Sequence, residues 1–435
     1  MAGAISKLLG SKYTDEQIQF IKKMKEEERL PWEKAVEKYN KKFNPVPLKT
    51  VDAIRKIYAK YGGIDFNDDA FIQNVKSAYI AKRRNSRLAK ENKMIIGEVV
   101  TLDEIKDVFE DLLNKVQFKL HKPIKKTKNS NKKTDRTLVA HLSDTHYGNN
   151  ISKNEMGGIN SYSNCIAARR TALFFKNISQ FKPQYRSHTD LVLVLNGDLA
   201  TGIIHDQEHA VDLMTKQFAT LLSIIGQGVS YLAQHFNKIT VYCTAGNHMR
   251  FMHKRSKSRA VANKWDSFAT MAYISLQREF TSYKNISFVI PESPYAIFDV
   301  QGRRAFATHG DSVFQVGNPS KVVKIGDIAA QVDRINNSEL ARKKKIGLFF
   351  VAHVHTPMVV LLDNGSYVYI NGCLSGLDSF GQSIGIFGNN PTQQLLEVTK
   401  DHVGDCRLVC VKEADEDASL DKIIDWKSNQ LFEES

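Results

Sequence analysis

The spacing of apolar residues changes near residue 136. Between residues 14 and 60, apolar residues recur every three or four positions in three segments, TDEQIQFIKKMKEEE, LPWEKAVEKYNKKF and PLKTVDAIRKIYAKYGG. This period is typical of amphipathic helices. An N-cap threonine, a proline at a helix start and a Gly-Gly pair mark the ends of the segments. We therefore expect three short helices packed around Trp32.

From residue 137 onward, short apolar runs alternate with segments of helical period. The runs TLVAHLS, DLVLVLNG, ITVYCTAG, RRAFATHG, IGLFFVAH and SYVYING are typical of buried strands. A hairpin is expected to turn at Gln301 and Gly302, and LLEVTKDHVGDCRLVCVKE predicts a closing pair of strands. Strands that alternate with helices indicate a layered α/β architecture. Helices are expected within residues 161–180, 207–235, 257–280 and 321–343.

The stretch between these two patterns contains an apolar stripe, TLDEIKDVFEDLLNKVQFKL, and then the lysine-rich segment HKPIKKTKNSNKKTDR. The stripe is expected to pack against another surface, and self-association into a homo-oligomer is one option. The lysine-rich segment has too few apolar residues for a core and is typical of a linker. The predicted parts are a three-helix module (1–62), a helical connector (63–121), a linker (122–136), an α/β domain (137–413) and an acidic tail (414–435).

The net charge of +14 lies mostly in the N-terminal third of the chain. Residues 1–136 contain 31 Lys and Arg against 19 Asp and Glu, which leaves only +2 for the rest. A basic region beside a nearly neutral one favours a nucleic-acid partner. The alternative is a set of solvated helical faces that are merely rich in lysine.

Three helices of this length around a tryptophan resemble the helix-turn-helix bundles of the homeodomain and Myb class. The resemblance implies that the third helix lies in a groove of DNA. A plain three-helix oligomerisation module is the alternative, because many small bundles share the pattern. The candidate DNA contacts are Lys49, Arg55, Lys56 and Lys60.

The rest of the composition predicts a cytoplasmic protein with no membrane partner. No apolar run approaches the ~20 residues that a spanning helix needs, and the first residues are too polar for a secretory signal. The five cysteines are scattered without CxxC spacing. A disulfide framework or a zinc finger is therefore not expected.

Polar side chains of a particular kind follow five of the predicted strands. Open α/β sheets place ligands beyond the C-terminal ends of their strands, so we expect these side chains to meet at one rim. Singly, an aspartate or asparagine in such a position usually caps a turn. Jointly, buried carboxylates and imidazoles are costly unless cations neutralise them. The residues are Asp144, His146, Asp198, Asn247, His248, His309, His353 and His355.

Mixed nitrogen and oxygen ligands that include two aspartates suit borderline divalent metals. More ligands are available than one tetrahedral ion needs. A two-metal site in which one aspartate bridges the ions is therefore favoured. We expect Mn²⁺, with Fe²⁺ or Zn²⁺ as alternatives.

The blocks DTH, NGD, GNH, THG and AHVH, in this order within residues 137–375, resemble the signature of the calcineurin-like metallophosphoesterase superfamily. The resemblance implies a four-layer α/β/β/α sandwich, in which helices flank two facing sheets. It implies that His248 is not a metal ligand but stands beside the scissile phosphate as a general acid or transition-state stabiliser. It also implies one ion held by Asp144, His146, Asp198 and His355 and a second ion held by Asp198, Asn247, His309 and His353.

The sequence departs from the superfamily pattern at three places. Met249 follows the GNH block where the family often has an acid, and Asp206 is a candidate replacement. Ala352 replaces the usual glycine before the last histidine pair, and LATG after Asp198 lacks the usual asparagine or aspartate. The first departure concerns the group that would orient His248, and the metal ligands are untouched.

Other charged and histidine residues lie near these blocks. The cationic segment after GNH would suit a polyanionic substrate, and an exposed loop with incidental charge is the alternative. His205 and His209 are expected to flank a helix, and His141 to lie in the core. The candidate substrate contacts are Arg250, Lys254 and Arg255.

These observations together predict a metal-dependent phosphodiesterase that acts on nucleic acid, with a DNA nuclease preferred. In the expected two-metal mechanism, water activated by the ions attacks the phosphorus in line. One alternative is a phosphomonoesterase acting on a phosphoprotein or a small phosphorylated metabolite. Another is a DNA-binding or assembly protein without catalysis.

Overall fold

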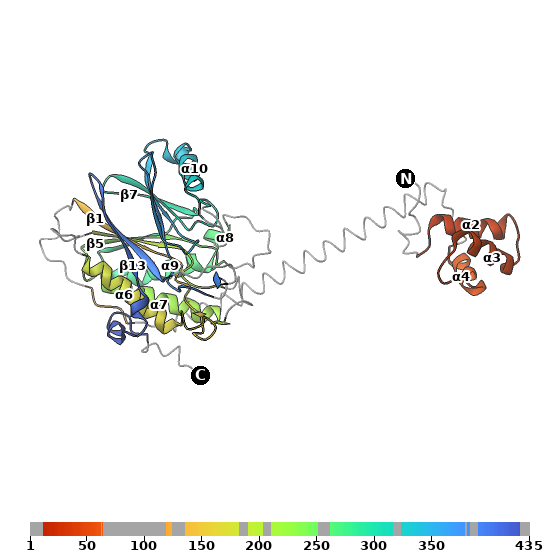
Figure 1. The fold of residues 1–435 in the computed structure, drawn as a ribbon, viewed down its shortest axis with the longest axis horizontal. Coiled ribbons are helices and arrows are strands. Elements are labelled where there is room, and N and C mark those ends of the chain that lie inside the picture. The colour runs from red at the N-terminus through yellow and green to blue at the C-terminus, as the bar shows by residue number, and fades with distance from the viewer. Residues whose placement is uncertain are drawn as a thin grey trace. The chain divides into compact units, whose positions relative to one another are not determined.

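Two units make up the chain, Met1–Asp107 and Val108–Ser435 (Figure 1). None of the described helices has the length and apolar content that crossing a membrane requires. The computed structural model describes residues 12–61, 63, 119–123, 135–181, 190–202, 210–250, 262–315, 323–378, 381–382 and 390–426.

The three segments of helical period each form a helix in the first unit, α2 (Asp15–Glu26), α3 (Trp32–Phe43) and α4 (Val51–Tyr61). Thr14 caps α2 in a capping box with Gln17, which satisfies two backbone donors at the helix start. Whether this bundle belongs to the helix-turn-helix class stays a prediction. Its core contains Ile18, Ile21, Met24, Ala35, Val36, Tyr39, Ile54, Ile57 and Tyr61.

The second unit contains two large sheets. The six-stranded sheet has the order β13-β12-β1-β3-β5-β6, and the five-stranded sheet has the order β10-β11-β9-β8-β7. The first sheet contains β1 (Arg136–Leu142), β3 (Asp190–Asn196), β5 (Lys238–Thr244), β6 (Ile286–Val289), β12 (Thr392–Thr399) and β13 (Val403–Cys410). The second contains β7 (Tyr295–Val300), β8 (Arg303–Thr308), β9 (Ile346–Val351), β10 (Met358–Leu361) and β11 (Tyr367–Ile370).

Parallel neighbours at the centre of each sheet bring several strand ends to the same edge. In the first sheet β1, β3, β5 and β6 run parallel. In the second sheet β8, β9 and β11 run parallel. The predicted hairpin is present as the antiparallel pair of β7 and β8, and the predicted closing pair is β12 and β13.

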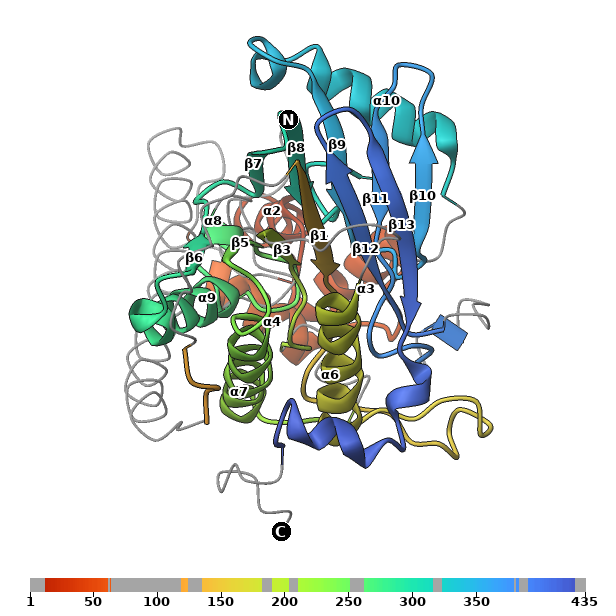
Figure 2. The same cartoon turned by 90° about the vertical axis from the view of Figure 1, so that its left-hand side faces the viewer.

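Helices lie outside the two sheets, and an apolar core lies between them. Figures 1 and 2 show α6 (Asn164–Gln180), α7 (Met214–Leu232) and α9 (Phe268–Glu279) on the side of the first sheet. The inner core joins Val139 and Val194 of the first sheet to Phe298 and Phe350 of the second. The predicted mixed α/β fold with two sheets and helices is therefore confirmed for this unit.

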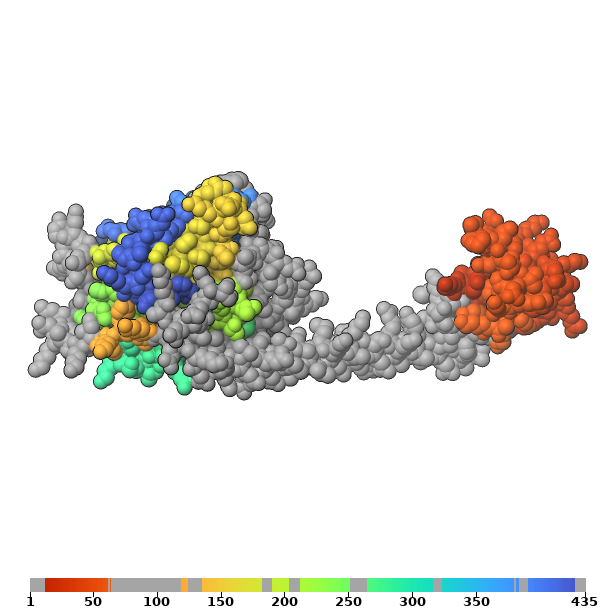
Figure 3. Space-filling model, turned by 90° about the horizontal axis from the view of Figure 1, so that it is seen from below, coloured from red at the N-terminus to blue at the C-terminus, as the bar shows by residue number. Residues whose placement is uncertain are grey.

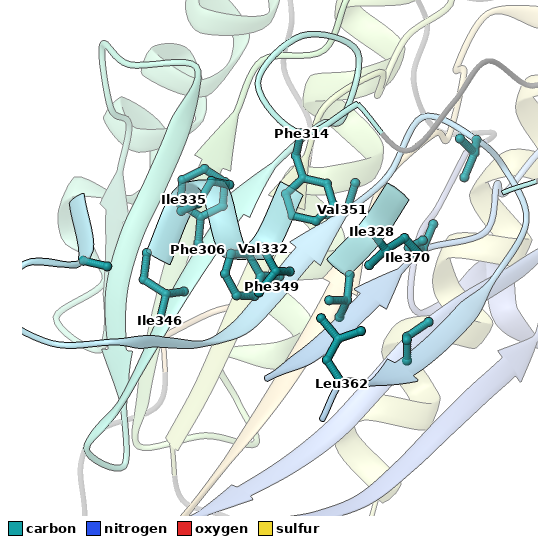
Figure 4. Packing of buried hydrophobic residues seen from close by; sticks show 14 residues of the cluster. Phe306, Phe314, Ile328, Val332, Ile335, Ile346, Phe349, Val351, Leu362 and Ile370 are labelled. Carbon is teal, nitrogen blue, oxygen red and sulfur yellow. The ribbon is translucent and has the colours of Figure 1, made fainter. Parts of the chain in front are cut away.

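The helix α10 (Ile325–Asn336) covers the outer face of the second sheet (Figure 4). Its Ile328, Val332 and Ile335 pack in one cluster with Phe306 and Phe349 of that sheet. Because each central strand is covered on both faces, its apolar run is nearly continuous rather than alternating.

The remaining elements are short. They are the strand pair β2 (Asn149–Asn150) and β4 (Ala210–Val211), the helix α8 (Ala262–Trp265), and the 3₁₀ turns η1 (Phe280–Ser282), η2 (Glu339–Ala341), η3 (Lys412–Ala414) and η4 (Ala418–Lys422).

Residues 414–426, the described part of the predicted acidic tail, lie against α6 (Figures 2 and 3). The side chain of Arg170 on α6 is fully buried and donates to both oxygens of Asp415, at 2.6 and 2.8 Å. It also donates to the carbonyl oxygens of Leu374 and Ser375. Arg170 therefore ties the end of the chain to the loop that follows β11.

We predict that Arg170→Met lowers the free energy of unfolding by about 2–3 kcal/mol. The substitution removes the buried donor of the Leu374 and Ser375 carbonyl oxygens and one of the two cations beside Asp415, while Lys412 still lies 3.3 Å from that carboxylate. Chemical denaturation of the variant measures the change. Arg342→Met is the control, since its pair with Glu339 is 75% and 82% exposed and exposed pairs contribute at most about 1 kcal/mol. Equal effects of the two substitutions would contradict the structural role of Arg170.

Candidate metal centre

Five strand ends from both sheets deliver polar side chains to one place. The ends of β1, β3 and β5 in the first sheet carry Asp144, Asp198 and the Asn247-His248 pair. The ends of β8 and β9 in the second sheet carry His309 and the His353-Val354-His355 segment. Three groups have ligand atoms within 4.8 Å of one another, namely Asp144, His146 and His355; His146, Asp198 and His248; and Asp198, His309 and His353.

The backbone carries five of these residues in the left-handed region. Their φ angles lie between 48° and 75°, a range that costs about 1–2 kcal/mol for a residue with a Cβ. Such strain persists only where the surrounding structure holds it, and it clusters at functional sites. The five residues are Asp144, His146, Asp198, His353 and His355.

Two glycines allow the strand ends to approach so closely. A Cβ on Gly197 would lie 2.6 Å from the nitrogen of Gly246 and 2.7 Å from Nδ1 of His309. A Cβ on Gly246 would lie 2.0 Å from Oδ1 of Asp198. The glycines of the NGD and GNH blocks therefore permit contact between β3, β5 and β8 where the carboxylate of Asp198 stands.

A hydrogen-bond network occupies one oxygen of Asp144. Asn371 Nδ2 donates to the hydroxyl of Ser143 at 2.9 Å, so that hydroxyl donates its own hydrogen to Oδ2 of Asp144 at 2.7 Å. Gln393 accepts from Asn371 and from the backbone of Ser143, which fixes both. Among the described residues, Oδ1 of the fully buried Asp144 has no hydrogen-bond partner.

The pKa values of the residues at the centre are set by two opposing effects, burial of the side chain and the charge of its neighbours. Burial alone would raise the pKa of Asp144, but the imidazoles of His355 and His309 outweigh burial and lower it to about 2. Burial would lower the pKa of His309, but the carboxylates of Asp198 and Asp144 raise it to about 9. Burial lowers the pKa of His353 to about 4, helped by the charge of His309. The same effect lowers the pKa of His146.

The tautomer of His309 follows from its backbone contact. Its Nδ1 lies 2.8 Å from the carbonyl oxygen of Asn196, which can only accept, so Nδ1 carries a hydrogen. Its Nε2 lies 2.7 Å from Oδ2 of Asp198. With the pKa of His309 raised to about 9, its imidazolium forms an ion pair with this carboxylate, and a cation held here would replace that positive charge.

His248 is oriented by the backbone. Its own N–H donates to Oδ1 of Asp198 at 2.9 Å, and its Nδ1 lies 2.8 Å from the carbonyl oxygen of Thr201. Its ring lies edge-on to that of His146, with centroids 4.7 Å apart. Because Nδ1 donates to Thr201, Nε2 is the ring atom that remains for proton transfer, and it lies 3.9 Å from Oδ2 of Asp198.

These donors fit a pair of divalent cations. Among the described residues, the side-chain oxygen of Asn247 joins Oδ1 of Asp144 as a buried acceptor without a hydrogen-bond partner. Neutral imidazole nitrogens and carboxylate oxygens are the ligands that Mn²⁺, Fe²⁺ and Zn²⁺ accept. Asp198 takes part in two of the three groups, so it stands where a bridging ligand would.

The structure places some of the other residues that the sequence analysis named and does not describe the rest. His141 is fully buried within β1 and bonds to Asn196, as predicted for a core histidine. Arg250 forms a backbone bridge with Ser267. The other candidates in this part of the chain, Lys254, Arg255, His205, Asp206 and His209, lie outside the described residues.

The candidate DNA contacts lie on the first unit. Arg55, Lys56 and Lys60 are exposed on α4, and Lys49 precedes it. Lys56 is 3.4 Å from Asp52, and the guanidinium of Arg55 lies 5.7 Å from the centre of the Trp32 ring. The three residues on α4 therefore present accessible positive charge.

The sequence analysis did not identify the residues that hydrogen-bond to the candidate ligands and to the loops that carry them. Ser143, Asn371 and Gln393 hold Asp144, and Lys264 bonds to Asp311 and to the carbonyl oxygen of Ala245 beside the GNH block. The position of Ser143 next to the DTH block was the one available signal. The amides gave none, because their partners are distant in sequence.

The chain matches the family model described as calcineurin-like phosphoesterase over residues 137–375, more than half of its length. The chain therefore belongs to the calcineurin-like phosphoesterase family, as the resemblance predicted. With the candidate ligand groups, this membership supports a metal-dependent hydrolase of phosphoric esters. No curated protein matches the chain.

Solved structures similar to the chain have low scores. Vacuolar protein sorting 29 from Cryptosporidium parvum is 12% identical, covers 63% of this chain and 96% of its own, and has a TM-score of 0.30. Zinc-complexed Vps29 from Entamoeba histolytica is 11% identical, with coverages of 63% and 99% and a TM-score of 0.27. A hypothetical protein from Pyrococcus horikoshii OT3 is 13% identical, with coverages of 66% and 97% and a TM-score of 0.35. The family assignment rests on the sequence match.

We predict that the metal-free protein loses stability as the pH rises from about 6.5 to 9. The pKa of His309 is raised to about 9 in the folded state and is about 6.5 in an unfolded chain. Its contribution is therefore complete below the unfolded pKa and is lost as the pH rises through the folded pKa, by an amount on the order of 2–3 kcal/mol.

Urea denaturation in the presence of a chelator, at pH 6.5 and 9, measures this loss. His309→Gln is the control, because its pH dependence lacks the contribution of the imidazole. Wild type and variant with parallel pH dependences would contradict the assigned protonation.

Proposed function

We propose that the protein is a two-metal phosphodiesterase that cleaves nucleic acid, with DNA as its preferred substrate. The single observation that carries the hydrolytic part is the convergence of two aspartates, an asparagine and five histidines from two sheets. Two divalent cations, when bound, activate a water molecule and neutralise the phosphoryl oxygens. The proposed ligands are Asp144, His146, Asp198 and His355 for one ion, and Asp198, Asn247, His309 and His353 for the other.

The residues of the chain have separate tasks in this scheme. Asp198 would be shared by both ions, since it belongs to two of the three candidate ligand groups. The network behind Asp144 presents one oxygen and occupies the other. His248 keeps Nε2 directed at the site and donates a proton from it to the departing oxygen, which typically contributes ~10²–10⁴-fold.

The choice of nucleic acid is supported by charge. Of the net +14, residues 1–136 carry +12, and Arg55, Lys56 and Lys60 are exposed on α4. Phosphate neutralisation by lysine and arginine provides most of the affinity for a nucleic-acid backbone. A phosphomonoesterase is the second candidate, because the metal centre alone would serve either ester.

We predict that Asp198→Asn reduces manganese-dependent hydrolysis of bis-p-nitrophenyl phosphate by more than ~10²-fold, because loss of a bridging ligand is worse than loss of a supporting hydrogen bond. Absorbance of released p-nitrophenol measures turnover, and calorimetric titration with Mn²⁺ measures binding. Asp190→Asn is the matched control, because Asp190 begins the same strand at its opposite end. Unchanged turnover in Asp198→Asn would overturn the assignment of the bridging ligand.

The same assay with p-nitrophenyl phosphate decides between the two esters. We expect turnover of the diester to exceed that of the monoester. The reverse ranking would replace the diesterase proposal with the monoesterase. Chelation of the metal should abolish either activity.

We predict that replacing Lys49, Arg55, Lys56 and Lys60 with alanine in the full chain weakens binding to duplex DNA. The slope of log affinity against log salt should fall by about 0.9 for each phosphate that the variant no longer neutralises. Fluorescence anisotropy at several salt concentrations measures both quantities. Replacing Arg342, Lys343, Lys344 and Lys345 with alanine removes the same formal charge from the other unit and is the control.

A slope that falls equally in both variants would mean that only net charge matters. A slope that changes in neither would remove the support for a DNA-binding first unit.

A further inference from the structure

A peptide group beside His248 is held from two sides. On one side, the hydroxyl of Thr201 donates to the carbonyl oxygen of His146 at 3.0 Å. On the other side, the N–H of Gly202 donates to Oε1 of Gln217 at 2.7 Å, and Nε2 of Gln217 donates to the carbonyl oxygen of Gly202 at 3.2 Å. The peptide group that joins Thr201 to Gly202 therefore has a fixed orientation.

This peptide group is also the one that contacts the histidine. The carbonyl oxygen of Thr201 lies 2.8 Å from Nδ1 of His248, and the N–H of Gly202 belongs to the same amide. The hydrogen bonds consequently run in series from Nδ1–H of His248, through the amide, to Oε1 of Gln217. Consecutive hydrogen bonds polarise one another, which strengthens each of them.

Gln217 and Gly202 are packed so tightly that the Thr201–Gly202 peptide group has little room to move. The side chain of Gln217 is 1% exposed on α7, and both ends of its amide are bonded, with Nε2 also donating to Asp212 at 2.8 Å. A Cβ on Gly202 would lie 1.9 Å from the carbonyl oxygen of His248, so the loop packs directly on the backbone of that histidine. Gly202 has a φ of +70°, which favours glycine as well.

We propose that Gln217 is a positioning residue for His248. Through the Thr201–Gly202 peptide it selects the tautomer with hydrogen on Nδ1 and aims Nε2 at the reacting phosphate. The residue after His248 is Met249, which is buried and offers no carboxylate. Gln217 therefore provides the orientation that an adjacent acid would provide. This inference rests on the proposed function.

The test compares substrates that differ only in leaving group. Aryl diesters of thymidine 5′-phosphate, from p-nitrophenol to phenol, place increasing demand on protonation by His248. In the full chain with Mn²⁺, Gln217→Met should reduce kcat for the phenol ester by about 10–100-fold, the usual effect of losing a supporting hydrogen bond. The p-nitrophenol ester should change little, and KM for both should stay near the wild-type value. Gln217→Glu, which keeps the acceptor for Gly202, should restore part of the loss.

Gln227→Met is the matched control. Gln227 is a second buried glutamine on α7, 3% exposed, and its amide bonds to Ser223 and Asp425 instead of the loop at His248. If buried glutamines on this helix serve only to stabilise the fold, Gln217→Met and Gln227→Met should have the same effect on kcat for the phenol ester. That result would overturn the proposal. An unchanged dependence on leaving group in Gln217→Met would overturn it as well.

A readout without catalysis separates this inference from the proposed function. Nitrogen-15 NMR of histidine in the metal-free protein should show hydrogen on Nδ1 of His248 in the wild type and a mixture of tautomers in Gln217→Met. The signal is identified by its loss in His248→Gln. If the wild type hydrolyses none of the esters, the proposed function fails, and the tautomer measurement still decides the positioning role. An unchanged tautomer in Gln217→Met would overturn it.

Discussion

Burial of two carboxylates beside the same imidazole, that of His309, is the constraint on which the metal centre depends. Asp144 is fully buried and Asp198 is 2% exposed, at the ends of the neighbouring strands β1 and β3. Carboxylates that lose their hydration repel one another unless positive charge or hydrogen-bond donors compensate. The imidazole of His309 and the hydroxyl of Ser143 supply that compensation. The glycines of the NGD and GNH blocks bring the strand ends close enough for these interactions.

Much of the fold could be predicted from the sequence, because the central strands are covered on both faces and therefore appear as continuous apolar runs. The candidate ligands could be located for a related reason, since each follows such a run and carries a chemically distinctive side chain. The strands β6 and β10 were missed. Each has four residues at a sheet edge, and their burial alternates or is partial, so their pattern is weak. The pairing of β2 with β4 involves two residues each and has no detectable period.

The residues that hydrogen-bond to the candidate ligands and to His248 could not be predicted, because their partners are brought close only by folding. Gln393 lies within a strand and Gln217 within a helix, where single polar positions are common. Gln393 finds its partner Ser143 only after folding, across 250 positions of sequence. His248 is oriented by a backbone carbonyl, and every residue has one, so side-chain identity gives no indication of it. The pairing of Asp415 with the buried Arg170 was hidden in the same way, because an acidic stretch by itself suggests exposure to solvent.

The candidate ligands come from both halves of the sandwich. Asp144 and Asp198 follow strands of the six-stranded sheet, whereas His309, His353 and His355 follow strands of the five-stranded sheet. A cation bound by members of both sets would also cross-link the two sheets at the edge where they meet. Without such a cation, this edge of the seam depends on apolar packing and on ion pairs such as the one between His309 and Asp198. A cation bound there would therefore oppose local opening between the sheets, and removing it would expose this edge to proteases.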